Sequence, residues 1–300
     1  MDFLPLLKNV LEEGFIYGLM ALGVYVTYKI LDFPDLSVDG TFPLGGCLTA
    51  ILITQGVNPW LCLLLAFLAG GVAGCCTGLL HVKCKITDLL SGIIVMTALY
   101  SINMVVLGGV QGKAVLQFFN QDTIFNSGII TLLPEGLRPY RVLILTGILV
   151  LVGKLVLDLF LSTRCGLLLR ATGDNPAFVT SLAKSQGNMK ILGLALGNGF
   201  TAMSGSVLAQ QLENSSTAIG TGMVVQGLAA VIIGASLCSR FGKMKGSSTA
   251  ILGCVVYKGI LLLAMLYLPP VFLKLAMAAL FLFVLMGQQL SQKTKKEVVA

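Results

Sequence analysis

The sequence predicts an all-α, polytopic membrane protein. Of its 300 residues, 56% are hydrophobic and only 11% are charged, less than half of the roughly 25% charged residues found in a typical soluble domain. The mean hydropathy is +0.92. Several apolar runs approach the ~20 residues that an α-helix needs to cross a bilayer core about 30 Å thick. The 35 glycines fit this class, because small residues let transmembrane helices approach closely.

Nine apolar segments are predicted to span the membrane and to form one transmembrane domain over residues 1–300. The second and the seventh are short and interrupted by glycines, which predicts two broken helices. A tail follows the last span at residues 290–300. The predicted spans are residues 12–30, 43–55, 59–80, 87–108, 140–162, 190–209, 222–237, 247–267 and 270–289.

Basic residues in the connecting segments predict the side of the membrane that each segment faces. Twelve of the 20 fall on alternate connections or in the tail, and the positive-inside rule places these in the cytoplasm. The C-terminus is then cytoplasmic, whereas the N-terminus and the long connection at about 109–139 are outside. The cytoplasmic group is Lys83, Lys85, Arg164, Arg170, Lys184, Lys190, Arg240, Lys243, Lys245, Lys293, Lys295 and Lys296, and the outside group is Lys8, Lys113, Arg138 and Arg141.

Two stretches of the chain resemble each other at an offset of 180 residues, "LSVDGTFPLGGCLTA" at 36–50 and "STAIGTGMVVQGLAA" at 216–230. Each opens one of the short, interrupted spans. Repeated halves with paired broken helices point to a translocation site near the midplane of the membrane. The identical pairs in this internal pseudo-repeat are Gly40 and Gly220, Thr41 and Thr221, Leu48 and Leu228, and Ala50 and Ala230.

The first of these broken segments also contains three carboxylates, Asp32, Asp35 and Asp39. Non-helical backbone at membrane depth survives only where it is buried in protein or lines a cavity, and carboxylates there are usually functional. An ordinary solvated loop, with Pro34 and Gly40 as turn residues, explains the same residues equally well. The candidate residues for a translocation path are Asp35, Ser37, Asp39, Gly40, Thr41, Gly220 and Thr221.

Ionisable residues also occur within the later predicted spans. Lys154 and Asp158 are four residues apart, so they meet on one face of a helix. Mutual neutralisation near the cytoplasmic end is favoured for this pair over a role in transport. Lys258 is expected to snorkel towards the interface or to face the protein interior.

One polar element interrupts the apolar chain at residues 167–187, "LLLRATGDNPAFVTSLAKSQG". Asn175 followed by Pro176 predicts the start of a helix of about ten residues, and Gly187 predicts its end. The apolar residues recur with helical spacing and form a stripe, which consists of Phe178, Val179, Leu182 and Ala183. Such a helix either lies at the lipid interface or docks in a groove of a cytoplasmic partner.

Several separated blocks closely resemble the permease subunits of bacterial ABC importers, in the superfamily that contains the branched-chain amino acid and ribose permeases. The first block is "GLLLRATGDNPAFVTSLAKSQGNMKILGLALGNGFTAMSGSVLAQ", and it is followed by "GTGMVVQGLAAVIIG". A further block, "YKILDFPDLSVDGTFPLGG", is similar to the subfamily with tryptophan- and tyrosine-type binding proteins. The resemblance covers residues 14–290.

The resemblance implies that the polar helix at about 175–187 is the coupling helix, which seats in a cleft of a separate ATP-binding cassette ATPase. It also implies a second permease copy, most simply a homodimer, an extracytoplasmic substrate-binding protein, and a place in the bilayer of the bacterial inner membrane. The sequence departs from the family at Ala183-Lys184, where a leucine-glycine pair is common. The coupling residues implied are Arg170, Ala171, Gly173, Asn175 and Pro176, with Phe178 and Leu182 on the stripe.

The chain is not expected to be an enzyme. It has no Walker A pattern and no Ser/His/Asp or Cys/His arrangement, and its single histidine leaves little material for catalysis and gives no His/Cys metal cluster. No catalytic residue, metal site or cofactor is therefore predicted in this chain, and the resemblance places ATP and Mg²⁺ on the partner ATPase. The spread of basic residues over short loops does not indicate a nucleic-acid surface.

Two functions agree with the sequence. The first is the translocation subunit of an ATP-driven importer for a small solute, where the resemblance favours an amino acid, aromatic rather than branched-chain. The alternative is an ion-gradient-driven secondary transporter that uses Asp35 and Asp39 as proton or cation sites. The alternative explains the broken helices but gives the polar helix at 175–187 no role.

Overall fold

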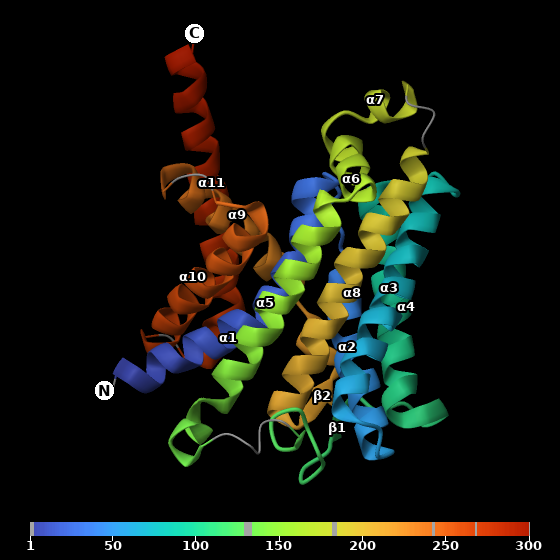
Figure 1. The fold of residues 1–300 in the computed structure, drawn as a ribbon, viewed down its shortest axis with the longest axis vertical. Helices are drawn as coiled ribbons and strands as arrows, with labels where there is room; N and C mark the ends of the chain where they lie inside the picture. The colour runs from blue at the N-terminus through green and yellow to red at the C-terminus, as the bar shows by residue number, and fades with distance from the viewer. Residues whose placement is uncertain (1–2, 129–133, 182–184, 242–243, 268, 300) are drawn as a thin grey trace.

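The computed structural model describes residues 3–128, 134–181, 185–241, 244–267 and 269–299. Figure 1 shows a predominantly helical chain, to which one small antiparallel sheet is added. The α-helices are α1 (Phe3–Val24), α2 (Val38–Thr54), α3 (Pro59–Val82), α4 (Asp88–Gly108), α5 (Arg141–Ser162), α6 (Arg164–Asp174), α7 (Pro176–Ser181), α8 (Gln186–Leu212), α9 (Met223–Phe241), α10 (Gly246–Tyr267) and α11 (Leu273–Val299). The shorter elements are the π-helix η1 (Tyr25–Ile30), the 3-10 helices η2 (Gly109–Gln111), η4 (Glu135–Tyr140), η5 (Thr217–Gly220) and η6 (Pro270–Phe272), and the strands β1 (Val115–Gln117) and β2 (Asn214–Ser216).

Seven helical segments in the described part of the chain are long and apolar enough to cross a membrane. Two shorter apolar helices, Val38–Thr54 and Lys274–Gly287, lie where two more spans were predicted. The fold is therefore that of an all-α polytopic membrane protein, as the composition predicted. The count of nine spans stays a prediction.

The boundaries of α2 and α11 differ from the predicted ones in ways that change the interpretation. α2 begins at Val38 rather than at residue 43, and Pro43 lies inside it, so the interruption of this span falls at residues 31–37. At the other end of the chain, α11 continues to Val299. Residues 290–299 are thus part of a helix and not a separate tail.

The helix α8 lies at the centre of the bundle and packs against α1, α2 and α3. Small residues make this packing close. Gly70 and Gly74 of α3 lie directly against the backbone carbonyls of Asn198 and Leu194 on α8, where a Cβ atom has no room. In the most apolar stretches of Leu4–Ile30 and of α8, 72% of the residues are buried, so α1 and α8 form the core.

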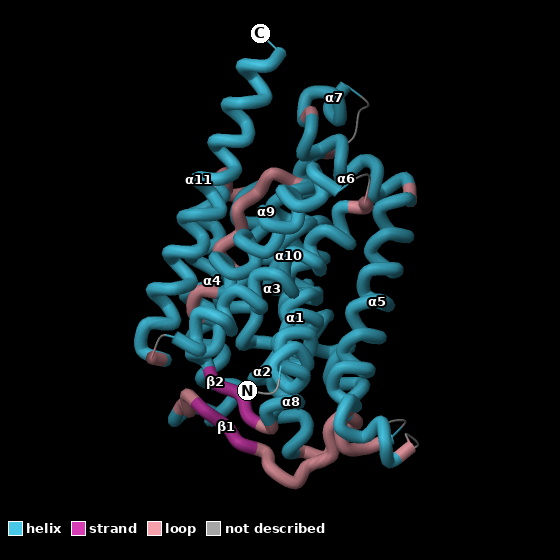
Figure 2. The backbone as a smooth tube through the Cα atoms, turned by 90° about the vertical axis from the view of Figure 1, so that its left-hand side faces the viewer, coloured by secondary structure: helices cyan, strands magenta, loops and turns pink. Residues whose placement is uncertain are grey.

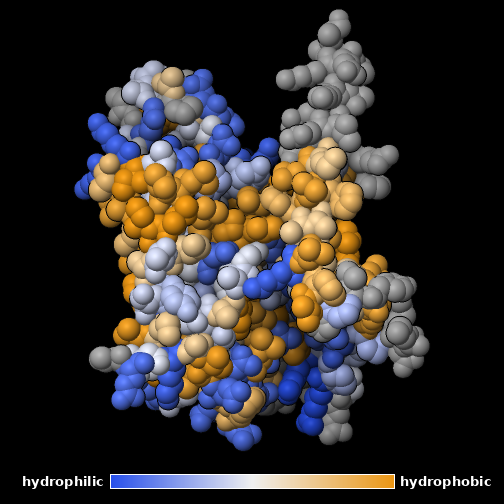
Figure 3. Space-filling model, turned by 180° about the vertical axis from the view of Figure 1, so that it is seen from behind, coloured by the Kyte–Doolittle hydropathy of each residue, from blue (hydrophilic) through white to orange (hydrophobic). Residues whose placement is uncertain are grey.

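The two ends of the molecule are distinct. At one end, called the α7 end below, lie α6, α7 and the connection between α3 and α4, whereas Figure 2 shows the β1–β2 sheet at the opposite end. In this sheet Val115 pairs with Ser216, which ties the long 109–139 connection to the segment after α8. Figure 3 shows hydrophilic residues at both ends and large hydrophobic areas between them, with less hydrophobic residues in the middle of this face.

The basic residues that the structure describes divide between the two ends as the sequence predicted, and Lys184 and Lys243 lie outside the described residues. At the α7 end, Lys190 contacts His81, and Lys245 shares a pocket with Arg170. At the opposite end, the Nζ atom of Lys8 lies 5.7 Å from the ring centre of Tyr140. Which of these ends faces the cytoplasm stays a prediction from the positive-inside rule.

Candidate functional site

Residues 31–37 re-enter the helix bundle in a non-helical conformation. Ile30 lies against Gly173 of α6, so the chain reaches the α7 end at this point. Soon afterwards Asp35 contacts Asn198, which lies twelve residues into α8. At 1.5 Å per residue this is about 18 Å from the start of α8. α2 therefore begins at about half the depth of the bundle as a short helix, and the glycines predicted to interrupt it lie within this continuous helix.

Asp35 fastens the re-entrant segment to α8. Its Oδ2 atom accepts a hydrogen bond of 2.7 Å from Nδ2 of Asn198, and its Oδ1 atom accepts one of 2.8 Å from the backbone N–H of Ser37. The Ser37 hydroxyl donates to Oδ1 of Asn198 at 3.2 Å. Only 4% of Asp35 is exposed, and a buried carboxylate requires such partners. The solvated-loop interpretation is therefore wrong for Asp35.

Asp39 connects the first broken segment to the second. After α8 the chain passes through β2 and η5 and starts α9 at Met223. The carboxylate of Asp39 accepts hydrogen bonds from the backbone N–H groups of Gly222 (3.0 Å) and Val224 (2.8 Å). These groups lie at the start of α9, where backbone donors lack partners within the helix and a negative charge is favourable. Asp39 thus caps a helix that lies more than 180 residues further along the chain.

Gly220 packs against the first turns of α2. Pro43 has no N–H group, so the carbonyl oxygen of Asp39 loses its usual partner within the helix. Gly220 lies directly on this oxygen, and a Cβ atom at Gly220 would come 2.7 Å from the ring of Pro43. The absence of a side chain at residue 220 is therefore what lets the two broken segments meet. We call residues 31–43 together with residues 217–224 the mid-depth junction.

The other predicted path residues also belong to this junction, with different surroundings. Thr41 is buried and donates a hydrogen bond of 2.9 Å to the carbonyl of Ser37. Gly40 lies against Leu99 of α4, and its carbonyl accepts a hydrogen bond of 3.0 Å from Asn103. Thr221 is exposed. The structure thus brings all seven residues together, and whether they line a path stays a prediction.

Sequence reasoning missed Asn198 and Asn103, which hold the junction from α8 and α4. Both are amides within long apolar helices, and 0% of Asn198 and 1% of Asn103 are exposed. A buried amide in such a helix was the available signal, because it requires a hydrogen-bond partner.

The matched glycines of the pseudo-repeat differ in setting, since Gly40 is within α2 and Gly220 precedes α9. The internal repeat stays a prediction.

The polar element at 167–187 forms the end of one helix and a second, shorter helix. α7 begins at Pro176, as predicted, and the backbone N–H of Asn175 bonds to the carbonyl of Ala171 at the end of α6. The predicted stop at Gly187 is wrong, because Gly187 lies in the first turn of α8, which Ser185 caps through a 3.3 Å bond from the Asn188 N–H.

The apolar stripe predicted on this helix is partly used inside the subunit. Val179 is fully buried, so this residue packs inwards and does not form an exposed docking surface. Leu182 and Ala183, and the side chains of Pro176 and Phe178, lie outside the described residues. Gly173 packs so closely on Ile30 that movement of α6 must displace the end of η1.

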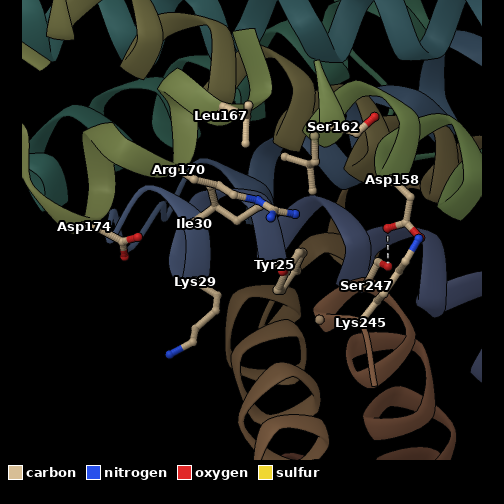
Figure 4. Close-up of a pocket in the computed structure, with 12 residues that line it drawn as sticks. Tyr25, Lys29, Ile30, Asp158, Ser162, Leu167, Arg170, Asp174, Lys245 and Ser247 are labelled. Carbon is tan, nitrogen blue, oxygen red and sulfur yellow. Dashed lines mark hydrogen bonds and ion pairs between the residues drawn. The ribbon is translucent and has the colours of Figure 1, made fainter. Parts of the chain in front are cut away.

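Arg170 lines a polar pocket of about 650 Å³ beside α6 (Figure 4). In this pocket Asp158 accepts a hydrogen bond of 2.5 Å from the hydroxyl of Ser247. Its Oδ2 atom lies 3.1 Å from Nζ of Lys154 and 3.6 Å from Nζ of Lys245. The predicted neutralisation of Asp158 by Lys154 is confirmed, and the group also joins α5 to the start of α10.

Lys258 faces the protein interior, which was one of its two predicted settings. Only 7% of Lys258 is exposed. Its Nζ atom lies 3.1 Å from a carboxylate oxygen of Glu13 and 3.6 Å from the ring centre of Tyr17, both on α1. The ion pair and the aromatic ring together compensate for burying the ammonium group.

Two interrupted helices that meet inside a bundle of apolar helices are typical of a membrane permease. The family of the permease component of the branched-chain amino acid transport system matches residues 6–286, so the chain belongs to this family of ABC permeases. Its relatives are permease subunits of transport systems and not enzymes.

Individual relatives agree with this family. Over 257 residues the chain is 40% identical to a tyrosine transport system permease protein of Clostridioides difficile (strain R20291). The aligned region covers 86% of this chain and 82% of the relative. It is 25% identical over 242 residues to a ribose import permease protein of Escherichia coli (strain K12), with coverages of 80% and 73%.

A solved structure shares the fold. It is PsaBC from Streptococcus pneumoniae in complex with Fab, with a TM-score of 0.50 and 13% sequence identity. The match covers 95% of this chain and 91% of the other. At this identity the likeness shows the fold alone.

Proposed function

We propose that this protein is the translocation subunit of an ATP-driven importer of an amino acid, with an aromatic one favoured. A homodimer of the chain forms the path, a substrate-binding protein delivers the solute, and ATPase subunits supply the energy. The observation that carries the substrate class is the 40% identity to a tyrosine transport permease along most of both chains. Membership in the ABC permease family supports the ATPase and the binding protein as partners.

The proposed path runs along the mid-depth junction. Here two helices start inside the bundle, and Asp39 and Thr221 retain contact with the surroundings. Broken helices at the midplane are the usual place for a substrate site in transporters. Asp35 and Ser37 are buried, so they act by holding the re-entrant segment in place.

The proposed contact with the ATPase is formed by α6 and α7. Figure 1 shows α7 at the tip of one end, outside the main bundle. α6 connects this tip to the bundle through the contact between Gly173 and Ile30. A push on α7 by the ATPase therefore reaches the segment that leads into the mid-depth junction.

The ion-gradient alternative gains no support from the carboxylates. Both oxygens of Asp35 and both oxygens of Asp39 already accept hydrogen bonds from neighbouring amides. A carboxylate used in this way stabilises backbone geometry, which is a sufficient reason for its presence without a bound proton or cation.

The test is uptake of radiolabelled tyrosine into proteoliposomes that contain the permease, its ATPase and its binding protein. We expect uptake that requires ATP and exceeds the uptake of leucine and of ribose. Uptake driven by a proton or sodium gradient without ATP would establish the alternative. ATP-dependent uptake of leucine or ribose alone would retain the importer and refute the aromatic substrate.

A further inference from the structure

His81, at the end of α3, makes polar contacts through both ring nitrogens. Its Nε2 atom lies 2.9 Å from Nζ of Lys190, and its Nδ1 atom lies 3.0 Å from the carbonyl of Ile86 and 3.0 Å from the carboxylate of Asp88. A lysine ammonium group can only donate, so Nε2 is the acceptor and the proton lies on Nδ1. One neutral tautomer of the ring satisfies all three neighbours.

The same ring also contacts the re-entrant segment. The rings of Phe33 and His81 lie edge to face, with centres 5.2 Å apart and planes at 87°. Phe33 is 1% exposed and lies two residues before Asp35, which fastens the segment to α8. Aromatic pairs in this arrangement contribute beyond their buried area. His81 therefore contacts the segment that leads directly to the mid-depth junction.

Lys190 belongs to the first two turns of α8, which are connected to α7. The Gln186 side chain, at the start of α8, donates a hydrogen bond to the hydroxyl of Thr180 on α7. Gly187, one residue later, lies so close to Val82 of α3 that a side chain there would overlap with it. The start of α8 thus contacts α7 on one side and the end of α3 on the other.

We propose that His81 is a positioning residue that transmits movement of α7 to the re-entrant segment. Lys190 carries the movement to the ring, and the ring carries it to Phe33 and so to Asp35. This inference rests on the proposed function, because the movement that it transmits is the one that the ATPase imposes on α7. Phe33 and His81 provide a second route, apart from the contact of Gly173 with Ile30.

The test compares two replacements of His81 in the complete complex of permease, ATPase and binding protein. H81Q keeps an acceptor for Lys190 and a donor for Asp88 but loses the ring that contacts Phe33. H81F keeps an aromatic ring against Phe33 but loses the polar contacts with Lys190 and Asp88. We expect H81F to lower substrate-stimulated ATP hydrolysis and uptake about tenfold, since hydrogen bonds to charged groups are worth roughly a factor of ten or more. H81Q should lower both activities as well, because it keeps the polar contacts but has no ring to contact Phe33.

A second substitution examines the partner of the ring. K190M removes the donor and should match H81F, and the H81F/K190M double variant should be no worse than either single variant. K83M, in the exposed connection after α3, is the matched control and should equal the wild type. All variants are compared for assembly with the ATPase, and K190M alone decides the test if H81F does not assemble.

Three results would overturn the proposal: wild-type activity in both H81F and K190M, wild-type activity in H81Q, or additive losses in the double variant. A wild-type complex without ATP-dependent uptake would instead refute the proposed function itself. The two failures are thereby separated within one set of measurements.

Discussion

At the mid-depth junction the carboxylates of Asp35 and Asp39 accept hydrogen bonds from backbone amides and from Asn198, whereas at the α7 end Asp158 pairs with two lysines. The first arrangement uses donors that are fixed by the backbone or by a buried helix. The second uses long side chains, one of which, Lys245, is 74% exposed. Charge at the mid-depth junction is thus held by rigid geometry, and charge around Asp158 is held by adaptable pairs.

This difference has an energetic basis. A buried carboxylate that loses a partner leaves an unsatisfied group, which costs about 1–3 kcal/mol or more when the group is charged. An exposed ion pair contributes only about 0–1 kcal/mol, because water replaces the lost partner. Substitutions at the junction should therefore have much larger effects than substitutions around Asp158.

The largest effect is expected from Gly220→Ala. The new methyl group would overlap the backbone carbonyl of Asp39 and the ring of Pro43, neither of which can move without shifting α2. Overpacking costs about 1–3 kcal/mol, and a backbone obstacle places this variant at the upper end. A lower melting temperature in detergent, together with loss of uptake, is the expected result.

Gly71→Ala is the matched control for this substitution. Gly71 also lies in an apolar helix, but the nearest atom to its added Cβ would be 3.7 Å away, which is an ordinary contact. The Gly71→Ala variant should melt at the wild-type temperature or above. Equal melting temperatures for the two alanine variants would show that the junction is not closely packed at Gly220.

Asp39→Asn should follow, with an effect on transport that exceeds its effect on assembly. Asparagine keeps one acceptor oxygen but turns its amide towards a backbone N–H, so one of the bonds to Gly222 and Val224 is lost. The start of α9 also loses a favourable negative charge. Uptake and the yield of the assembled complex measure the two effects separately, and wild-type uptake would remove Asp39 from the proposed path.

A reciprocal exchange sharpens the assignment of Asp35. Asp35→Asn places two amides against each other and Asn198→Asp places two carboxylates against each other, so each single variant should lose about 1–3 kcal/mol of stability. The double exchange restores a donor and an acceptor at each position, and the bonds from Ser37 are kept. Its melting temperature should recover at least half of the loss.

The exchange also separates structure from function. Recovery of both stability and uptake would show that Asp35 acts by holding the re-entrant segment. Recovery of stability without uptake would show that the carboxylate is needed at residue 35 itself. A double variant that is less stable than either single one contradicts the hydrogen-bond geometry.

The comparison also shows what the sequence could predict. Runs of apolar residues predicted the membrane-crossing helices, because the length of a span is fixed by the bilayer and not by its neighbours. Asn175 and Pro176 predicted the start of α7 for a similar reason, since a helix start depends on adjacent residues. The pair of Lys154 and Asp158 is local as well, being one helical turn apart.

The contacts of the junction are not local, and this is why sequence reasoning missed them. Asp39 caps α9 at a distance of 183 residues from Gly222, and Asp35 meets Asn198 across 163 residues. Carboxylates in a broken segment indicated an important region, but nothing in their spacing identified their partners. The predicted stop at Gly187 failed for the related reason that its small size serves packing on Val82 and not the end of a helix.

At the α7 end, Phe178→Asp is expected to change coupling without changing the fold. It places a charge on α7, the proposed contact with the ATPase, and an unpaired carboxylate buried in a protein groove is strongly unfavourable. Co-purification of the ATPase, or substrate-stimulated ATP hydrolysis, should fall while insertion and dimerisation stay normal. Wild-type co-purification and ATP hydrolysis in this variant would place α7 at the lipid surface instead.

The smallest effects should come from the lysines around Asp158, and they should differ from each other. Lys154 is 19% exposed and lies 3.1 Å from the carboxylate, whereas Lys245 is 74% exposed and lies 3.6 Å away. Lys245→Met should therefore change the stability by less than about 1 kcal/mol, as exposed pairs do. Lys154→Met should cost more, because Asp158 is only 11% exposed and then depends on Ser247 for its closest contact. Melting temperatures of the two variants at low and high salt measure the contributions of Lys154 and Lys245 to stability. High salt should reduce the contribution of Lys245 more strongly. Equal losses for the two variants would mean that the α7 end holds its charge as rigidly as the mid-depth junction does.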